Sequence, residues 1–467
     1  MSIAPVVSFL GGAGTVTGSR FLLETAAARV LVDAGQFQGV KRLRLRNWEP
    51  FPVDPRSIDA VVVTHAHLDH IGYLPALVAR GLDAPVFVTE NTAALAPIVL
   101  FDAARLQEEE AEYANRKGFS KHRPALPLFT QDDAAAALEL LRPLPFSARE
   151  EIASGVTASL HPVAHILGSA AVTLTVDVAS GRRRTLLVSG DVGRPAHPIL
   201  REPPPAPDAD VVLVESTYGD RTHEEEDVAV ERLADVIRRT AGRGGTVVIP
   251  AFAVDRTEVV LLTVRRLVTE GRIPSLPVYA DSPMALDVLD VYRDAIDGRD
   301  AEVRPELDIE GDPFDPGRLE VARTPQESMA LNDQRFPSII ISASGMASGG
   351  RVLHHLANRL PSSRNSVVLV GFQAEGTRGR LLADGARAVK LLGRYVPVRA
   401  EVVDVGGFSV HADAGELVEW LRPARPPDIA FAVHGEPVAA AAFARRLDDD
   451  LGWHAVVAGD GERVRLD

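Results

Sequence analysis

The sequence contains no cysteine, and this absence restricts how the chain could hold a metal ion or stabilise its fold. Without thiols it can form neither a disulfide nor a thiolate metal site, so any bound metal must be held by imidazole and carboxylate groups. Aromatic residues make up only 5% of the 467 residues, and lysine occurs only at positions 41, 117, 121 and 390. Nearly all of the cationic charge is therefore arginine, and no dense aromatic platform for stacking bases is expected.

Long apolar runs are also missing. No stretch approaches the ~20 apolar residues needed to cross a bilayer, and the N-terminal MSIAPVVSF lacks the pattern of a signal peptide. We therefore expect a cytoplasmic protein with no membrane partner. The net charge of -14 argues against unspecific adhesion to nucleic acid or anionic lipid. It does not exclude a local phosphate-binding cleft, because bound divalent metals and a few arginines would dominate the field at short range.

Short apolar, β-branched runs recur along the chain and alternate with amphipathic helical stretches, a pattern typical of an α/β fold whose sheets are covered on both faces. The length favours more than one compact unit. Residues of metal-binding type occur in the first and last thirds of the chain but not in the middle. We therefore predict one metal-binding domain, formed by residues 1–208 and 396–467, with an insertion at 209–395 that follows the proline-rich break EPPPAPD.

The segment VVVTHAHLDHIG, residues 61–72, places four metal-binding side chains directly after an apolar run. Alternating residues of an extended segment point the same way, so His65, His67 and Asp69 can converge, and His70 joins them where the chain turns into a helix. Without a metal, these groups would be costly and mutually repelling at a strand end. Four ligands within six residues exceed what one ion usually takes from so short a segment, so two neighbouring ions are implied.

Further ligands should follow other strands, because open α/β sheets gather ligands at the carboxyl ends of their strands. His165, Asp191 and His434 meet this condition. A lone histidine after a strand is more often an ordinary polar residue than a metal ligand. His165 and His434 are therefore predicted as ligands only because the cluster at 65–70 is present. Asp191 is suited to bridge two ions, because a carboxylate has two oxygens. The predicted ligands are His65, His67, Asp69, His70, His165, Asp191 and His434.

In this order the ligands resemble the signature of the metallo-β-lactamase fold: His-x-His-x-Asp-His, a later His, a bridging Asp and a last His. Asp33 in VLVDAGQF matches the early Asp of that family, which resembles a support for a ligand more than a ligand. The resemblance implies an αββα sandwich. Together with the insertion, the expected fold class is α/β, a metallo-β-lactamase sandwich carrying an inserted α/β domain.

Three further motifs resemble those of the β-CASP nucleases of this superfamily: ESTYG with Glu215, GGFSVHAD with His411, and VHGE with His434. The resemblance extends over nearly the whole chain, including PAFAVDR at 250–256. The last motif is a histidine in RNA-processing members, which favours RNA over DNA. The layout is similar to bacterial and archaeal homologues of the cleavage and polyadenylation specificity factor endonuclease.

The activity that the resemblance implies is hydrolysis of phosphodiester bonds in single-stranded RNA, with hydroxide bridging two Zn²⁺ ions per chain. His65, His67 and His165 would hold one ion, Asp69, His70 and His434 the other, and Asp191 both. Cleavage is expected to be endonucleolytic. The predicted catalytic residues are Asp191, His411 as general acid to the leaving oxygen, and Glu215, which would orient His411.

Two glycine-rich segments, 342–351 and 371–380, offer backbone amides, hydroxyls and arginines that suit phosphate oxygens, although glycine-rich loops are more often plain tight turns. Asp255 stands where glycine is expected in PAFAVGR, and its carboxylate would lie beside the phosphate contact of Arg256. The predicted substrate contacts are Arg256, Ser344, Arg351, Thr377, Arg378, Arg380 and Ser409.

Two other functions fit parts of the pattern. A small-molecule ester or thioester hydrolase of the same fold would need the metal ligands but not Glu215, His411 and both glycine-rich loops. An inactive RNA-binding scaffold would be expected to have lost metal ligands, whereas none is missing here. The sequence does not decide between endonucleolytic and 5′-exonucleolytic action. It also does not decide whether the protein acts on DNA, which transcript it cleaves, or whether it forms a homodimer.

Overall fold

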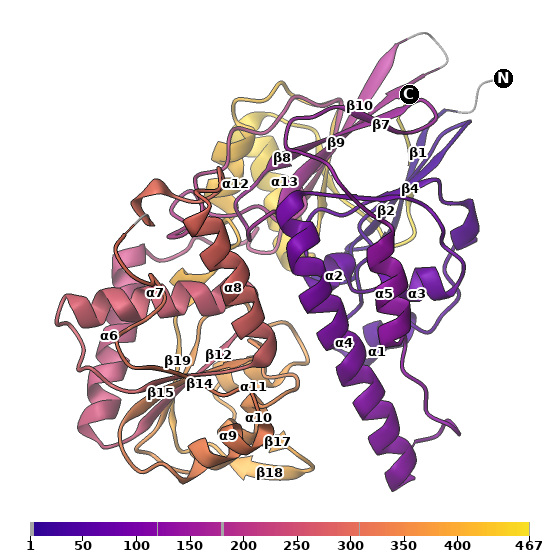
Figure 1. Ribbon diagram of the computed structural model, residues 1–467. Helices are drawn as coiled ribbons and strands as arrows, with labels where there is room; N and C mark the ends of the chain where they lie inside the picture. The colour runs from indigo at the N-terminus through magenta and orange to yellow at the C-terminus, as the bar shows by residue number, and fades with distance from the viewer. Residues whose placement is uncertain (1–3, 119, 179–181, 308, 467) are drawn as a thin grey trace. The chain divides into compact units, whose positions relative to one another are not determined.

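The computed structural model describes residues 4–118, 120–178, 182–307 and 309–466 and divides the chain into two compact units (Figure 1). The first unit comprises Met1–His197, Arg201–Thr222 and His411–Asp467, and the second comprises Pro198–Leu200 and His223–Val410. The boundaries after Thr222 and after Val410 lie later in the chain than the predicted boundaries, which followed positions 208 and 395. The reason is strand pairing, because β11 (Val211–Glu215) pairs within the first unit and β19 (Glu401–Asp404) pairs within the second.

The first unit contains two seven-stranded sheets. The first sheet has the order β22 (Arg463–Arg465), β1 (Val6–Gly11), β2 (Arg20–Glu24), β3 (Arg29–Val32), β4 (Ala60–Val62), β5 (Val86–Val88), β6 (Leu141–Pro143). The second has the order β21 (Ala455–Val457), β20 (Ile429–Val433), β11, β10 (Arg183–Val188), β9 (Ala170–Asp177), β8 (Val156–Pro162), β7 (Glu150–Ala153).

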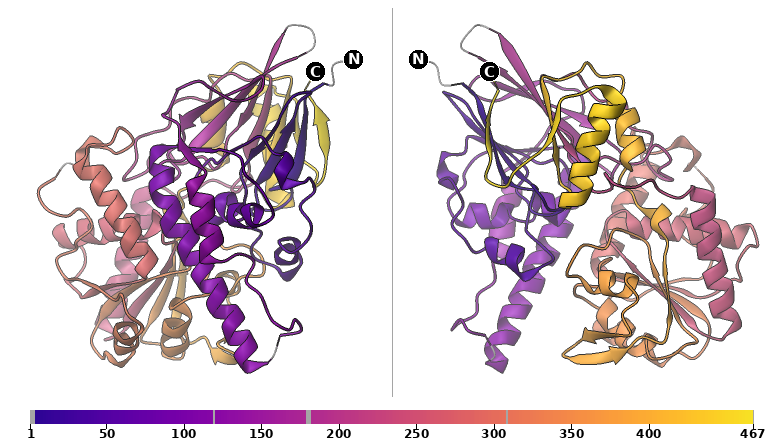
Figure 2. Two further views of the ribbon diagram at one scale, coloured as in Figure 1. Left: turned by 45° about the vertical axis from the view of Figure 1, so that its right-hand side comes forward. Right: turned by 180° about the vertical axis from the view of Figure 1, so that it is seen from behind.

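The two sheets bury a common core, and side-chain alternation decides which residues join it. Val211 and Leu213 of β11 lie in the core between the sheets, whereas Val212 and Val214 face the helices that cover the other side. Helices cover both outer faces (Figure 2). They are α2 (Leu68–Ile71), α3 (Leu74–Ala79), α4 (Glu90–Lys117) and α5 (Gln131–Glu139) on the first sheet, with α12 (Ala414–Leu421) and α13 (Pro437–Leu451) on the second. The short helix α1 (Lys41–Arg46) has no buried residue. The predicted αββα sandwich is confirmed.

The second unit is built on a six-stranded, fully parallel sheet. Its order is β14 (Leu319–Val321), β13 (Val278–Asp281), β15 (Ser338–Ala343), β12 (Thr246–Ala251), β16 (Ser366–Leu369), β19. The helices of this unit are α6 (Glu226–Gly242), α7 (Arg256–Thr269), α8 (Pro283–Asp297), α9 (Pro325–Ala330), α10 (Val352–Arg359) and α11 (Arg378–Ala383). A hairpin of β17 (Ala388–Leu391) and β18 (Arg394–Pro397) packs with α10 against the sheet. No helix in the described part of either unit has the length and apolar character to cross a membrane.

The start of α7 contains a strained turn at Asp255, the position where glycine was expected. Its backbone has φ 69 and ψ -45, and the N–H of Arg256 donates to the carbonyl of Val254, which is a γ-turn of the rare positive-φ kind. The Asp255 side chain is buried and accepts a hydrogen bond of 2.8 Å from the Tyr292 hydroxyl. The carboxylate therefore binds a tyrosine of α8, which compensates part of the strain.

Glu258, one turn further along α7, is fully buried, and neither of its carboxylate oxygens has a hydrogen-bond partner among the described residues. Burial, reinforced by the negative charge of Asp255, raises the pKa of Glu258 well above its usual range, although backbone amides at the helix start act the other way. A carboxyl whose folded-state pKa is raised stabilises the fold below its unfolded pKa. This contribution is lost as pH rises through the folded pKa.

We therefore expect the Glu258→Gln variant to gain stability relative to wild type as pH rises from 5 to 8. The difference in unfolding free energy should grow by up to about 1.4 kcal/mol per pH unit until Glu258 is ionised. Thermal unfolding across this pH range measures it, with exposed Glu306→Gln as the control. A difference between Glu258→Gln and wild type that does not change with pH would contradict the buried, protonated state.

Candidate metal centre

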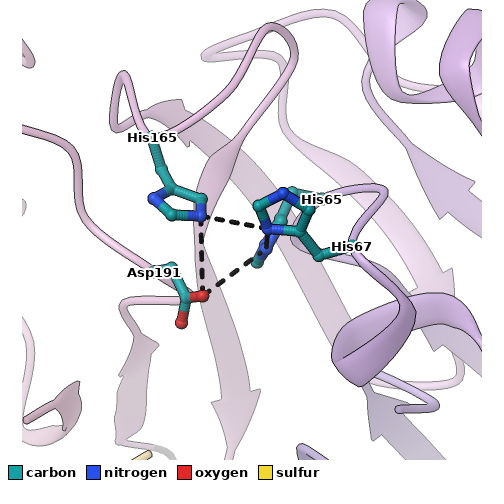
Figure 3. Close-up of side chains that lie close together, drawn as sticks. All are labelled: His65, His67, His165 and Asp191. Atoms are coloured by element: carbon teal, nitrogen blue, oxygen red, sulfur yellow. Dashed lines mark hydrogen bonds and ion pairs between the residues drawn. The ribbon is translucent and has the colours of Figure 1, made fainter. Parts of the chain in front are cut away.

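Four side chains of the first unit bring ligand atoms to one point: His65, His67, His165 and Asp191 (Figure 3). The Nδ1 atom of His67 lies 3.1 Å from Nε2 of both His65 and His165. One oxygen of Asp191 lies 3.6 Å from His65 Nε2 and 3.7 Å from His165 Nε2. Four ligands at roughly 2.0–2.2 Å from a tetrahedral ion are about 3.3–3.6 Å apart, so this group has the spacing of a metal site.

Asp69, His70 and His434 form a second group of the same kind. His434 Nε2 lies 3.5 Å from a carboxylate oxygen of Asp69. His70 Nε2 lies 3.3 Å from Asp191 Oδ2, the oxygen that also faces the first group, and Asp191 Oδ1 lies 3.1 Å from His434 Nδ1. The Asp191 carboxylate is therefore shared by both groups, which is the arrangement expected of a ligand between two ions.

The protonation states of the first group suit metal binding, because metals bind neutral imidazole and ionised carboxylate. Burial lowers the pKa of His65 and His165 well below the usual value and lowers the pKa of His67 to about 4. Burial opposes ionisation of Asp191. The surrounding imidazoles, His434 first, nevertheless lower the pKa of Asp191 well below its usual range.

Two buried nitrogens of the second group, Nε2 of His70 and Nε2 of His434, face the carboxylates of Asp191 and Asp69 at 3.3 and 3.5 Å but make no hydrogen bond among the described residues. Such groups are costly unless they bind something. Burial acts against a proton on His70, but the carboxylates of Asp191 and Asp33 raise the pKa of His70 well above its usual value. A field that holds a proton on this imidazole also attracts a metal cation, so the residues present fit a pair of divalent ions.

A buried support lies behind the second group. Asp33 Oδ2 accepts a hydrogen bond of 2.7 Å from His70 Nδ1, which leaves Nε2 to face the cluster. Asp33 also accepts from the backbone N–H and the hydroxyl of Thr64, at 2.8 and 3.0 Å. The hydrogen bond to His70 therefore fits the expected role of Asp33, which is to support a ligand. Thr64, which also lies 3.0 Å from His65 Nδ1, was not predicted from the sequence.

Three positions in the loops that carry this cluster have a strained backbone. Nine non-glycine residues in the described part of the chain have positive φ, and three of them are Asp33, Ala164 directly before His165, and His434. Gly193 is required nearby, because a Cβ atom there would lie 1.8 Å from the carbonyl oxygen of Ala164. Strain of this kind persists where the surrounding structure demands one geometry, as at functional sites.

His411 and Glu215 lie at the edge of the same cluster. Glu215 is the last residue of β11 and is buried, and its Oε1 accepts a hydrogen bond of 2.7 Å from the N–H of Val192. The same oxygen lies 3.3 Å from His411 Nδ1. His411 sits just before α12, where Asp413 caps the helix by accepting from two backbone amides. The His411 side chain is 16% exposed, whereas those of His65 and His165 are fully buried.

Three stretches of the chain match known families. Residues 14–222 match the metallo-β-lactamase superfamily, residues 257–382 the Beta-Casp domain, and residues 395–458 the Zn-dependent metallo-hydrolase RNA specificity domain. A ribonuclease from Thermus thermophilus, TTHA0252, is 40% identical over 91% of this chain and 92% of its own length. The chain belongs to the β-CASP branch of the metallo-β-lactamase superfamily.

Other relatives of this chain carry different names. A transcription termination factor FttA from Methanocaldococcus jannaschii is 31% identical over 94% of this chain and 69% of its own length. An RNase J-like protein from the same organism is 29% identical over 95% of both chains. A solved structure of a protein of unknown function from Enterococcus faecalis covers 99% of this chain with a TM-score of 0.51 and 14% identity, which supports the fold alone.

The second unit, which contains the matched Beta-Casp domain, is called the β-CASP unit below. Its two glycine-rich segments, 342–351 and 371–380, lie against each other. The side-chain amide of Gln373 donates to the carbonyls of Gly345 and Gly371, and the N–H of Gly379 donates to the carbonyl of Met346. Ser344 accepts from the backbone amides of Ser348 and Gly349. The structure therefore brings both segments into one place, although most of their polar groups shape the loops themselves.

The predicted contact residues of this unit differ in how far their polar groups are already engaged. Arg351 binds the Asp281 carboxylate and the carbonyls of Ala322 and Arg323, all at 2.8 Å, and Arg378 binds three backbone carbonyls. Arg380 pairs with Asp384, and Thr377 caps α11. Arg256 is buried, and a Cβ atom on Gly371 would lie 3.7 Å from its Nε. The buried Ser409 hydroxyl has no partner among the described residues.

We expect Asp33→Asn to weaken metal binding at the second group by about 10–100-fold, because the amide has no negative charge and only one acceptor oxygen, which cannot serve both the Thr64 N–H and His70 Nδ1. Metal content after dialysis against a chelator, measured by elemental analysis, tests this, with exposed Asp83→Asn as the matched control. The variant should retain fewer ions per chain than the control while keeping its circular dichroism spectrum. Equal metal retention in both variants would show that Asp33 does not support a metal ligand.

Proposed function

We propose that this protein hydrolyses phosphodiester bonds inside single-stranded RNA, using two Zn²⁺ ions held at the candidate metal centre. The observation that carries the proposal is the convergence of seven predicted ligands, five of them buried and His67 and Asp69 partly buried, with the His411–Glu215 pair beside them. The names of the relatives TTHA0252 and RNase J-like protein, and the matched RNA specificity domain, support RNA as the substrate.

His65, His67 and His165 would hold one ion, Asp69, His70 and His434 the other, with Asp191 shared. When bound, a pair of divalent cations supplies an activated water and neutralises charge on the phosphate oxygens. Zinc is favoured because every candidate ligand is an imidazole nitrogen or a carboxylate oxygen. The chain's own contribution is to hold these groups in the binding form and to exclude bulk water through burial.

His411 would donate a proton to the leaving oxygen. If Nδ1 carries the hydrogen bond to Glu215 Oε1, Nε2 is the nitrogen left to reach the substrate. Glu215 would hold the imidazole in this orientation, since its own carboxylate is anchored to the backbone of Val192. Attack by water rather than by the 2′-hydroxyl would leave 5′-phosphate and 3′-hydroxyl ends.

The β-CASP unit would bind the RNA backbone through Arg256, Ser344, Thr377, Arg380 and Ser409. Arg351 and Arg378, predicted from the sequence as contacts, would act mainly by holding the glycine-rich loops, because their donors already bind carbonyl and carboxylate oxygens. Location in the cytoplasm and a possible homodimer remain predictions.

Two substitutions separate the roles within the cluster. We expect His411→Ala to lower kcat on single-stranded RNA by about 10²–10⁴-fold while leaving the metal content unchanged, because it removes a proton donor and no ligand. Asp191→Ala should lose both metal and activity. His454→Ala, which removes an exposed histidine, is the matched control and should behave as wild type.

A circular single-stranded RNA is the best substrate for this comparison, because it has no end from which an exonuclease could start. Linear products with 5′-phosphate ends support endonucleolytic hydrolysis. Cleavage of linear RNA alone would indicate exonuclease action. Hydrolysis of a small ester but of neither RNA would favour the ester hydrolase, and RNA binding without metal or cleavage would favour the scaffold.

A further inference from the structure

The outer surface of helix α1 departs from the composition of the rest of this acidic chain. The helix and its next two residues read KRLRLRNW, with four cations in six positions and no acid among them. Lys41, Arg44 and Leu45 follow the spacing i, i+3 and i+4, so they share one face of the helix, and Trp48 follows two residues after the helix ends, where its N–H donates to the carbonyl of Leu45. All four are exposed, with Leu45 at 52% and Trp48 at 54%.

The cations of this surface are available for a partner. Within the part of the chain that the structure describes, the side chains of Lys41, Arg42 and Arg44 make no ion pair or hydrogen bond. Arg46, on the inner side of the helix, is instead engaged, because it pairs with Asp460 and lies over the Phe37 ring. The segment from Lys41 to Glu49 has four cations and one acid, Glu49, so its own charge is positive.

The surface is rigidly anchored to the first unit. Asn47 is buried directly beside Trp48, and its side-chain amide accepts from and donates to the backbone of Phe37, at 3.0 and 2.8 Å. Arg20 reaches the same amide and stacks on the Tyr73 ring, with its guanidinium carbon 3.8 Å from the ring centroid. The backbone that carries Trp48 is therefore fixed next to Asn47, so little of this segment would need to be ordered on binding.

The anchor is also continuous with the metal centre. Phe37 lies four residues after Asp33. The loop between them is fixed to helix α2, because the N–H of Ala34 donates to the backbone carbonyl of His70 and the N–H of Gln36 donates to the backbone carbonyl of Leu68. The basic surface thus stands on the same loop that supports the His70 ligand. This places it in fixed relation to the proposed site of cleavage.

We propose that the exposed face of α1, formed by Lys41, Arg44, Leu45 and Trp48 with Arg42 beside it, is an accessory binding surface for single-stranded RNA. The proposal rests on the proposed function and extends it to RNA outside the cleavage site. Phosphates would pair with the three unpaired cations, and a base would stack on Trp48, a combination typical of single-strand binding without sequence preference. An acidic protein or a second copy of this chain is the alternative occupant.

Intrinsic fluorescence gives a direct test, because the chain has three tryptophans and the other two, Trp420 and Trp453, are only 7% and 2% exposed. The protein is used in its metal-loaded His411→Ala form to slow cleavage, and it is titrated with an oligoadenylate of about 20 nucleotides. Quenching that disappears in Trp48→Phe is the expected result. Quenching that persists in Trp48→Phe, or none while the RNA binds, overturns the proposal.

The cations are tested with a charge-matched pair of triple variants. Lys41→Gln, Arg42→Gln and Arg44→Gln together should weaken RNA binding by about tenfold or more and reduce the slope of log K against log salt by roughly 2. The control replaces Arg387, Lys390 and Arg394 of the hairpin by Gln, which removes the same residue types from another exposed surface. Equal losses in both variants would indicate only bulk charge, and the proposal would be wrong.

The failures of the two proposals can be told apart. Cleavage of circular RNA by wild type decides the proposed function and does not depend on the α1 face. If wild type cuts RNA but the α1 triple variant binds as tightly as the hairpin control, this inference alone is wrong. Sedimentation of both triple variants covers the remaining alternative, because a change of oligomeric state confined to the α1 variant, with RNA affinity intact, would identify a self-association surface.

Discussion

The first unit depends on one shared carboxylate. A single oxygen of Asp191 lies between 3.3 and 3.7 Å from the imidazole nitrogens of His65, His70 and His165, and the other oxygen lies 3.1 Å from His434. A buried anion surrounded in this way is stable only if positive charge is brought to it. The loops after strands of both sheets must therefore meet at this point, and the sandwich architecture is what makes them meet.

Support for this cluster is distributed over residues outside the seven candidate ligands. Asp33 and Thr64 fix the ring of His70, Glu215 fixes His411, and the Thr217 hydroxyl contacts His434. The strained backbones at Asp33, Ala164 and His434 are tolerated because neighbouring strands and hydrogen bonds leave them little alternative. In the β-CASP unit the same principle applies to Arg351, whose guanidinium bridges Asp281 to the chain before α9.

The sequence predicts the parts of this structure that are encoded locally. An apolar strand followed by closely spaced histidines predicts both the strand β4 and the cluster of imidazoles after it, and the αββα class was implied by the resemblance to the metallo-β-lactamase signature. The roles of Thr64 and Thr217 could not be predicted, because they depend on where distant side chains lie in the folded unit. The unit boundaries were shifted for a similar reason, since the apolar pattern of β11 or β19 does not reveal which sheet it joins. Aspartate replaces the expected glycine at position 255, and its side chain accepts a hydrogen bond from Tyr292, which lies 37 residues later in the chain.

The central claim is that Asp191 joins two cation sites in one buried cluster. Anomalous X-ray diffraction from crystals of the zinc-loaded protein, recorded on both sides of the zinc absorption edge, tests it directly. The account predicts two peaks roughly 3.5–4 Å apart, one among His65, His67 and His165 and the other among Asp69, His70 and His434, with Asp191 between them. A single peak, or zinc bound away from Asp191, would contradict it.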